Sequence, residues 1–208
     1  MELMEAIRTR RSVRVYEDRA LPEAHLRRII EAATWAPSGF NKQPWKFIVI
    51  RERAIIEQMV AAVRSKLEEI SKWAGAKGNE KNIMAMLKGF TVFKEAPVAI
   101  AVLTCEYVAP MDKILAKEKL TFEEKFRLRA LPGLQSVAAA IQNMLLAATA
   151  MGYGTCWGTG CLIASEGIEK ILKAGDGWQL VAVVPVGIAK VTPKPPKRKA
   201  VDAVMEIL

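Results

Sequence analysis

The feature that most constrains the fold is the continuous apolar run from Pro97 to Thr104. Successive side chains of a strand point to opposite faces, so a strand that is apolar throughout must be covered on both faces of its sheet. Trp45–Ile50 and Trp178–Ala189 also have the β-branched and aromatic content of strands, and Pro185 predicts a bulge or an edge in the second of them. The chain is therefore expected to build a sheet that is covered on both sides.

Helical periodicity appears on either side of these strands. The expected helices are Leu3–Arg8, a segment from Pro22 to Pro37, Ile55–Trp73, Asn82–Phe93 and Leu134–Ala150. The last of these is apolar nearly all round, which predicts that it is buried. Strands mixed with helices indicate an α+β fold, and residues 1–208 are expected to form a single domain.

The composition is that of a globular chain, with 51% hydrophobic and 25% charged residues among 208. The longest apolar-rich stretch, Val137–Met151, contains Gln142 and Asn143 and is shorter than the ~20 apolar residues of a membrane span. The acidic start of the chain does not resemble a signal peptide, and three cysteines are typical of a reducing compartment. These features predict a cytoplasmic protein with no membrane segment.

The chain is basic, with 31 Lys and Arg against 22 Asp and Glu and a formal charge of +9. The excess gathers near the two ends, at Arg8, Arg10, Arg11 and Arg14, and at Lys194, Lys197, Arg198 and Lys199. Such clusters attract phosphate esters or nucleic acid. The tryptophans lie in apolar segments and are not interleaved with the basic residues, which disfavours a stacking surface for nucleic acid. Nucleic-acid binding through the termini nevertheless remains an alternative.

Most catalytic signatures are missing from the sequence. His25 is the only histidine, so a Ser-His-Asp or Cys-His centre would depend on that one residue, for which a surface position is expected. Cys105, Cys156 and Cys161 do not supply the four Cys and His ligands of a zinc site and are expected to be small buried residues. No metal site is expected.

Two segments have the residue types of a binding site. Arg10-Arg11-Ser12-Val13-Arg14 offers guanidinium donors suited to a phosphate monoester, or else forms a solvated basic face. In the second segment, two prolines stiffen the loop that contains Ser38, Asn41 and Gln43. Those side chains are held for hydrogen bonding to a ligand, or else satisfy the loop's own backbone.

The run Gly152–Gly160 is rich in glycine but follows a helix, whereas a dinucleotide-binding fingerprint must follow a strand. Its glycines would let the backbone approach a flat ligand closely, because no Cβ stands in the way. A tight helix-to-strand turn explains the same residues.

The four ordered motifs together resemble the nitroreductase family of flavoproteins. They are the Arg10–Arg14 segment, the Pro37–Trp45 loop, the Ala139–Ala148 helix and the Gly152–Trp157 turn, and the likeness runs from about Glu5 to Ala203. The resemblance implies a nitroreductase-like fold, with a central, mostly antiparallel sheet flanked by helices. It also implies a homodimer with a central buried helix and FMN bound at the subunit interface.

The resemblance also implies roles for individual residues. Arg10, Arg11 and Ser12 would hold the FMN phosphate and ribityl end, Arg198 would return from the tail to the phosphate, and Arg14 would stabilise charge at N1 and the C2 carbonyl.

The flat ring of the cofactor would be held by two further segments. The loop residues expected at the flavin of the other subunit are Pro37, Ser38, Asn41 and Gln43. The residues expected along the isoalloxazine are Trp157, Gly158, Thr159 and Gly160.

The implied activity is an FMN-dependent oxidoreductase that uses NADH or NADPH to reduce nitroaromatic, quinone or similar acceptors. Hydride would pass through flavin N5 in a ping-pong sequence that needs no protein acid or base. Dehalogenating and flavin-fragmenting members of the same family are alternatives. Residues 111–130 resemble none of the family's motifs and are expected to form a lid over the site. Residues 192–208 are expected to form a basic tail.

Overall fold

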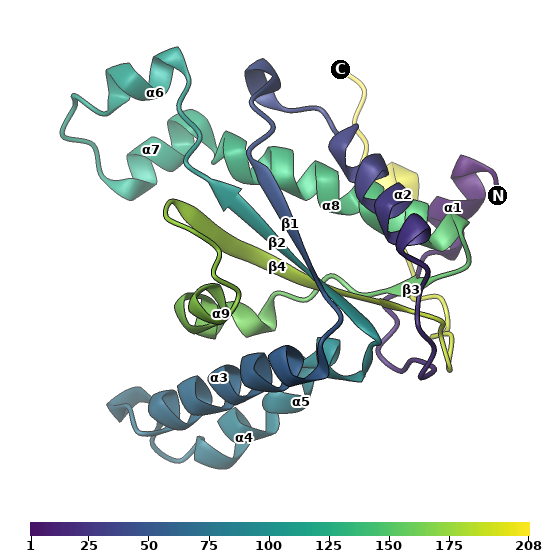
Figure 1. Ribbon diagram of the computed structural model, residues 1–208. Helices are drawn as coiled ribbons and strands as arrows, with labels where there is room; N and C mark the ends of the chain where they lie inside the picture. The colour runs from purple at the N-terminus through teal and green to yellow at the C-terminus, as the bar shows by residue number, and fades with distance from the viewer.

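The computed structural model describes residues 1–208 and contains a four-stranded sheet that separates two groups of helices (Figure 1). The strands are β1 (Trp45–Ile50), β2 (Val98–Cys105), β3 (Gly154–Thr155) and β4 (Trp178–Gly187). Their order is β1-β2-β4-β3, and every neighbouring pair is antiparallel. The expected α+β architecture with an antiparallel sheet is confirmed.

Strand β2 lies inside the sheet, which explains its continuous apolar sequence. Val98, Ile100 and Val102 pack into one buried cluster, while Ala99, Ala101 and Leu103 pack into another. The alternation of a strand therefore assigns the run from Pro97 to two cores, one on each face.

The ladder between β2 and β4 corrects one expectation. Its register shifts opposite Val102 and Leu103, which pair with Ala182 and Leu180 and leave Val181 as the extra residue. Pro185 instead pairs regularly with Ala99. Of the bulge or edge expected at Pro185, the bulge lies instead at Val181.

The helices are α1 (Leu3–Thr9), α2 (Glu23–Thr34), α3 (Arg53–Ser71), α4 (Glu80–Ala85), α5 (Leu87–Phe90), α6 (Pro110–Leu115), α7 (Phe122–Arg129), α8 (Pro132–Ala150) and α9 (Ser165–Ile171). Short 3-10 turns lie at Gly39–Asn41 (η1), Ala74–Ala76 (η2), Val92–Glu95 (η3), Gly160–Ala164 (η4) and Val201–Ala203 (η5). None of these helices combines the length and apolarity that crossing a bilayer requires.

The helix expected over Asn82–Phe93 is broken into α4, α5 and η3. Gly89 weakens the middle of this stretch, since glycine costs helix stability. Val92 and Phe93 then turn inward and are buried. Burial of these side chains outweighs continuation of the helix.

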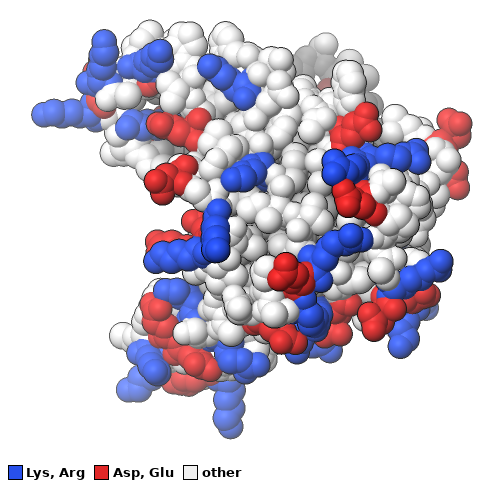
Figure 2. Space-filling view, in the orientation of Figure 1, with Lys and Arg blue, Asp and Glu red and all other residues white.

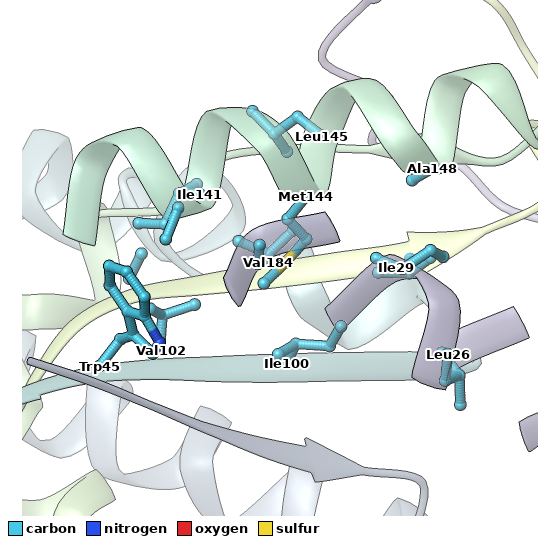
Figure 3. Packing of buried hydrophobic residues seen from close by; sticks show 14 of the residues in the cluster. Leu26, Ile29, Trp45, Ile100, Val102, Ile141, Met144, Leu145, Ala148 and Val184 are labelled. Carbon is cyan, nitrogen blue, oxygen red and sulfur yellow. The ribbon is translucent and has the colours of Figure 1, made fainter. Parts of the chain in front are cut away.

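Helices α2 and α8 cover one face of the sheet. Ile29 from α2 and Met144 from α8 pack against Ile100 and Val184 of the sheet, as Figure 3 shows. Within one chain α8 buries only one side, because Leu134 is 44% exposed and Gln142 is also exposed.

Helices α3 and α9 cover the opposite face (Figure 1). Met59 and Val63 of α3 and Ile168 of α9 are fully buried there, together with Phe93. The glycine-rich segment after β3 leads into η4 and α9 on this side, so it follows the edge of β4.

Candidate functional site

The Arg10–Arg14 segment continues from α1 as extended chain along β3. The Val13 N–H donates to the Thr155 carbonyl at 2.8 Å, and Ser12 forms a parallel bridge with Thr155. Gly154 permits this approach, because a Cβ there would lie within 2.7–2.9 Å of the Val13 side chain. The backbone of the basic segment is thus fixed beside the start of the glycine-rich turn.

Side chains of this segment lie near the thiol of Cys156. Burial raises the pKa of Cys156, while the neighbouring Arg14, Ser12 and Arg10 act to lower it. The structure therefore brings three of the predicted phosphate-binding and pyrimidine-edge residues to one place. Their common neighbour, Cys156, is buried, as the sequence predicted.

Arg11 lies in the same segment, but its guanidinium already donates hydrogen bonds to backbone carbonyls of the chain. Its Nη1 donates to the carbonyls of Arg8 at 2.7 Å and Arg10 at 2.8 Å, which caps the C-terminal end of α1. Arg14 Nη1 donates to the Ser12 carbonyl at 3.3 Å. The ion pairs of the chain involve none of Arg10, Arg11 and Arg14, so no acidic side chain neutralises them.

The glycine-rich turn is pinned to the middle of β4. Gly158 and Val183 exchange two backbone hydrogen bonds of 3.1 and 2.9 Å. A Cβ on Gly158 would lie 2.7 Å from the Val183 carbonyl oxygen, and a Cβ on Gly160 would collide with the ring of Phe90. Trp157 and Thr159 remain exposed beside them. The turn is a rigid strip of backbone with its glycines packed against protein.

The Pro37–Gln43 loop satisfies part of its own backbone. The Ser38 hydroxyl accepts a hydrogen bond from the Gln43 N–H at 3.0 Å. This serine therefore satisfies the loop's own backbone, which is one of the two alternatives that the sequence left open. Phe40, Asn41 and Gln43 have left-handed φ values of 53°, 51° and 48°, a strained arrangement for residues other than glycine. The Asn41 and Gln43 side chains are exposed, as is Pro37. The loop therefore leaves its amides available.

One chain holds these predicted residues in two separate groups. The Arg10–Arg14 segment lies against Thr155, just beyond the C-terminal end of α8. The Pro37–Gln43 loop packs on Tyr107, which itself contacts Gly133 at the N-terminal end of α8. A helix of 19 residues is about 28 Å long. A site that uses both groups therefore needs a second copy of the chain.

The basic tail starts beside the Arg10–Arg14 segment. The Lys190 N–H donates to the Val15 carbonyl at 3.0 Å, and the Glu17 N–H donates to the Ile188 carbonyl at 2.9 Å. Arg198, eight residues farther on, is exposed, and no hydrogen bond or ion pair within the chain connects its side chain to Arg10–Arg14.

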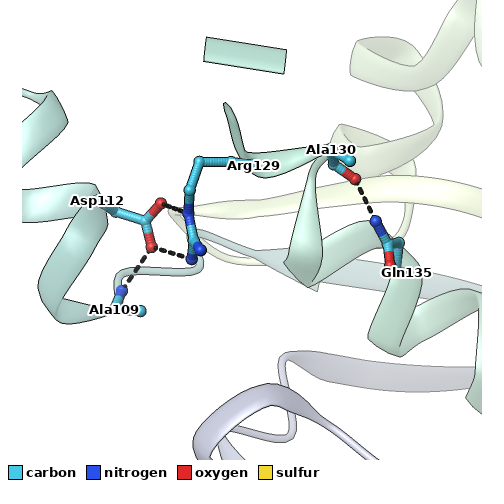
Figure 4. Close-up of polar contacts among 5 residues, drawn as sticks. All are labelled: Ala109, Asp112, Arg129, Ala130 and Gln135. Atoms are coloured by element: carbon cyan, nitrogen blue, oxygen red, sulfur yellow. Dashed lines mark hydrogen bonds and ion pairs between the residues drawn. The ribbon is translucent and has the colours of Figure 1, made fainter. Parts of the chain in front are cut away.

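The segment expected as a lid contains α6 and α7, which project from one end of the sheet (Figure 1). Arg129 holds both carboxylate oxygens of Asp112 at 2.7 and 3.0 Å, and Asp112 also accepts the Ala109 N–H at 2.8 Å (Figure 4). The hydrogen bond from Arg129 lowers the pKa of Asp112. This bidentate pair ties the start of α6 to the end of α7.

A cavity of about 460 Å³ lies beneath α6 and α7. Phe122, Phe126 and Tyr107 line it together with the paired Asp112 and Arg129. Figure 2 shows this face of the molecule hollowed below the α6–α7 excursion. Tyr107 also touches Gly39, so the cavity adjoins the loop expected at the flavin of the other subunit.

His25 differs from its expected surface position. It is half-buried, and its Nδ1 lies 2.6 Å from the Tyr153 hydroxyl in a side-chain hydrogen bond. Tyr153 follows α8 and packs at the margin of the α2–α8 core, so the histidine bridges two packed elements. It is not placed among the predicted cofactor residues.

The cysteines and acidic residues do not form a metal centre. No group of three or more His, Cys, Asp or Glu in the chain is arranged to hold a metal ion. Burial raises the pKa of Cys161 to about 12, so this thiol stays protonated in the core.

One part of the site was missed from the sequence. A second cavity, of about 870 Å³, is lined by Arg14 and by residues of α3, α5 and η3, among them Arg64, Lys88 and Val92. The only sequence signal was a single basic residue, Lys88, within an expected helix. Nothing local in the sequence could place Lys88 beside Arg14, which is 74 positions away.

The chain is similar to known proteins over most of its length. The sequence model of the nitroreductase family matches residues 7–188. A Methanothermobacter thermautotrophicus protein provisionally named NADH dehydrogenase/NAD(P)H nitroreductase is 31% identical over 90% of this chain and 77% of its own.

Two solved structures show the likeness in three dimensions. A BluB-like flavoprotein from Clostridium difficile is 30% identical, superimposes with a TM-score of 0.89, and is matched over 100% of this chain and 99% of its own. A nitroreductase with bound FMN from Desulfitobacterium hafniense superimposes with a TM-score of 0.73 at 23% identity, over the full length of both chains.

Proposed function

The chain belongs to the nitroreductase family, and from this premise we propose that it is an FMN-dependent oxidoreductase. It takes hydride from NADH or NADPH and passes it to nitroaromatic, quinone or similar acceptors. The observation that carries the proposal is the meeting of Arg10, Ser12 and Arg14 at Cys156, next to the glycine-rich turn.

The residues present fit a cofactor with a phosphate and a flat ring. Arg10, Arg11 and Ser12 supply donors for a phosphate, and no acidic side chain of the chain pairs with the two arginines. Gly158 and Gly160 let the turn pack closely against Val183 and Phe90, which holds this strip of backbone in place. Trp157 and Thr159 stand exposed on the same strip. Arg198 would complete the phosphate site from the tail.

The complete site would form between two copies of the chain. Large apolar side chains are exposed on α1, on the loop after α2, on α8 and on the tail, namely Leu3, Met4, Ile7, Trp35, Phe40, Leu134, Val201, Val204, Ile207 and Leu208. So much exposed apolar surface is typical of an interface. A homodimer would cover the open side of α8 and bring Pro37, Ser38, Asn41 and Gln43 of one copy to the arginines of the other.

FMN, when bound, supplies the centre that accepts and releases the hydride. The protein would bind and orient the cofactor and stabilise the charge that reduction adds to it. Arg14 would place its positive charge at the pyrimidine edge, where reduction adds negative charge. No proton donor is required of the protein, and His25 is already paired with Tyr153. The rigid turn at Gly158–Gly160 would fix the plane of the ring.

The α6–α7 excursion is proposed to cover the acceptor. Its cavity is lined by Phe122, Phe126 and Tyr107, which suit a flat and largely apolar molecule. Contact of Tyr107 with Gly39 puts this cavity against the loop that would reach the other subunit's flavin.

The test is reconstitution with FMN followed by assay of NADH and NADPH oxidation, with and without a nitroaromatic and a quinone. Acceptor-dependent oxidation of one donor supports the proposal. Bound FMN without such turnover would point to a dehalogenating or flavin-fragmenting reaction. Absence of FMN binding would leave nucleic acid as the anion to examine, although Figure 2 shows acidic and basic side chains interspersed on the face it presents.

A further inference from the structure

Helix α7 leaves one of its charged side chains without a partner inside the chain. The other charged residues of the helix are held, Glu123 by Arg127, Glu124 by Thr121 and Arg129 by Asp112. Lys125 takes part in no ion pair and is exposed. It also lines the cavity of about 460 Å³ beneath α6 and α7. The helix therefore presents one free ammonium group to this cavity.

The net charge of the cavity comes from Lys125. Asp112 and Arg129 are the only other charged residues that line it, and they neutralise each other through hydrogen bonds of 2.7 and 3.0 Å (Figure 4). Most of the remaining lining is apolar, so it offers no carboxylate to Lys125. A cation that is left unpaired beside an apolar cavity attracts a ligand with a negative charge.

The wall beside Lys125 is aromatic. Phe122 and Phe126 stack with their ring centroids 6.3 Å apart and their planes at 26°, and they are 73% and 47% exposed. Lys125 comes three positions after Phe122, so the two side chains lie on the same face of α7. Open aromatic faces at a cavity suit stacking of a flat ring. The volume lies in the lower part of the range of about 300–1,000 Å³ for small-molecule sites, which favours a ligand of one or two rings.

We propose that Lys125 selects acceptors that carry a carboxylate on an aromatic ring. The ring would lie against Phe122 and Phe126, and the carboxylate would accept charge-assisted hydrogen bonds from the Lys125 ammonium. This inference rests on the proposed function, because it names the class of acceptor that the cavity takes. Tyr107 lines the cavity and also contacts Gly39, so an acceptor held here would lie beside the loop expected at the flavin of the other subunit.

The experiment compares 4-nitrobenzoate with 4-nitrobenzamide, which has nearly the same shape and no charge, as acceptors for the FMN-loaded protein. The first readout is the ratio of kcat/KM for the two compounds. The second is the ratio of the association constants of benzoate and benzamide, measured by calorimetry with no donor present. Lys125→Gln removes the charge and Lys125→Arg keeps it. Lys117→Gln is the matched control, because Lys117 is an exposed lysine of the same excursion that does not line the cavity.

We expect the unmodified protein to favour the carboxylate and Lys125→Gln to lower both ratios about five-fold. Lys125→Arg and Lys117→Gln should keep both ratios. The preference for the carboxylate should also weaken as NaCl is added, because salt screens an exposed charge pair.

An unmodified protein without this preference, unchanged ratios in Lys125→Gln, or an equal loss in Lys117→Gln overturns the inference. If a quinone still supports oxidation of NADH or NADPH in such a case, the proposed function stands and this inference fails alone. If the unmodified protein retains no FMN, the proposed function fails and the inference fails with it.

Discussion

Replacement of Gly158 by alanine tests the rigidity of the proposed cofactor turn. The added methyl group would lie 2.7 Å from the Val183 carbonyl oxygen, whereas ordinary contact begins at 3.4 Å. The obstacle is backbone in the middle of β4, which cannot rotate away. The turn must therefore move outward and stretch the hydrogen bonds of 3.1 and 2.9 Å between Gly158 and Val183.

The expected cost follows from these contacts. Overpacking costs about 1–3 kcal/mol, and each hydrogen bond contributes about 0.5–1.5 kcal/mol, so losing both bonds as well gives about 2–6 kcal/mol in total. Urea unfolding without FMN measures this loss. Gly167→Ala is the matched control, because its Cβ would meet only Ala62 at 3.5 Å within α9, and it should gain about 0.5–1 kcal/mol. A Gly158→Ala variant within about 0.5 kcal/mol of the unmodified protein would refute the reasoning.

Three further predictions concern charged residues. Arg14→Ala should lower the midpoint potential by about 30 mV with FMN still bound, and an unchanged value in a spectroelectrochemical titration would exclude the proposed role. Arg198→Ala should raise the Kd for FMN about ten-fold in a fluorescence titration without changing urea stability, because Arg198 is exposed; unaltered affinity would place the phosphate elsewhere. Asp112→Asn should speed hydrogen exchange in α6 and α7 while β2 keeps its protection. Since the pKa of Asp112 is lowered in the folded chain, the stabilisation of α6 and α7 by the Asp112–Arg129 pair is complete above about pH 4 and is lost as the pH falls through that lowered pKa. Equally slow exchange in the variant would show that the pair does not stabilise α6 and α7.

Local sequence patterns predicted most of the secondary structure. Trp45–Ile50 is bounded by Pro44 and by charged residues, and the strand has these limits in the structure. The apolar run from Pro97 predicted β2 and the burial of both its faces, because a strand with one exposed face would alternate apolar and polar residues. Asn82–Phe93 was predicted wrongly as one helix, since Phe93 is buried in a cluster with side chains of α3, which local sequence could not show.

The candidate site was predictable only where a motif is contiguous. Arg10, Ser12 and Arg14 were expected together because they are neighbours, and the structure gathers them at Cys156. Lys88 was missed because its proximity to Arg14 is created by the packing of α5 against the turn. The hydrogen bond from the Gln43 N–H to the Ser38 hydroxyl forms in a loop whose backbone is left-handed at Phe40, Asn41 and Gln43, and this conformation was not predicted from the sequence.

Whether the protein is a flavoenzyme is decided by the visible absorption spectrum of the purified protein with added FMN, followed by anaerobic titration with NADH and NADPH. We predict a bound-flavin spectrum that bleaches with one or both donors and recovers when a nitroaromatic or a quinone is added. A spectrum identical to that of free FMN after gel filtration, or no retained flavin at all, would contradict the account.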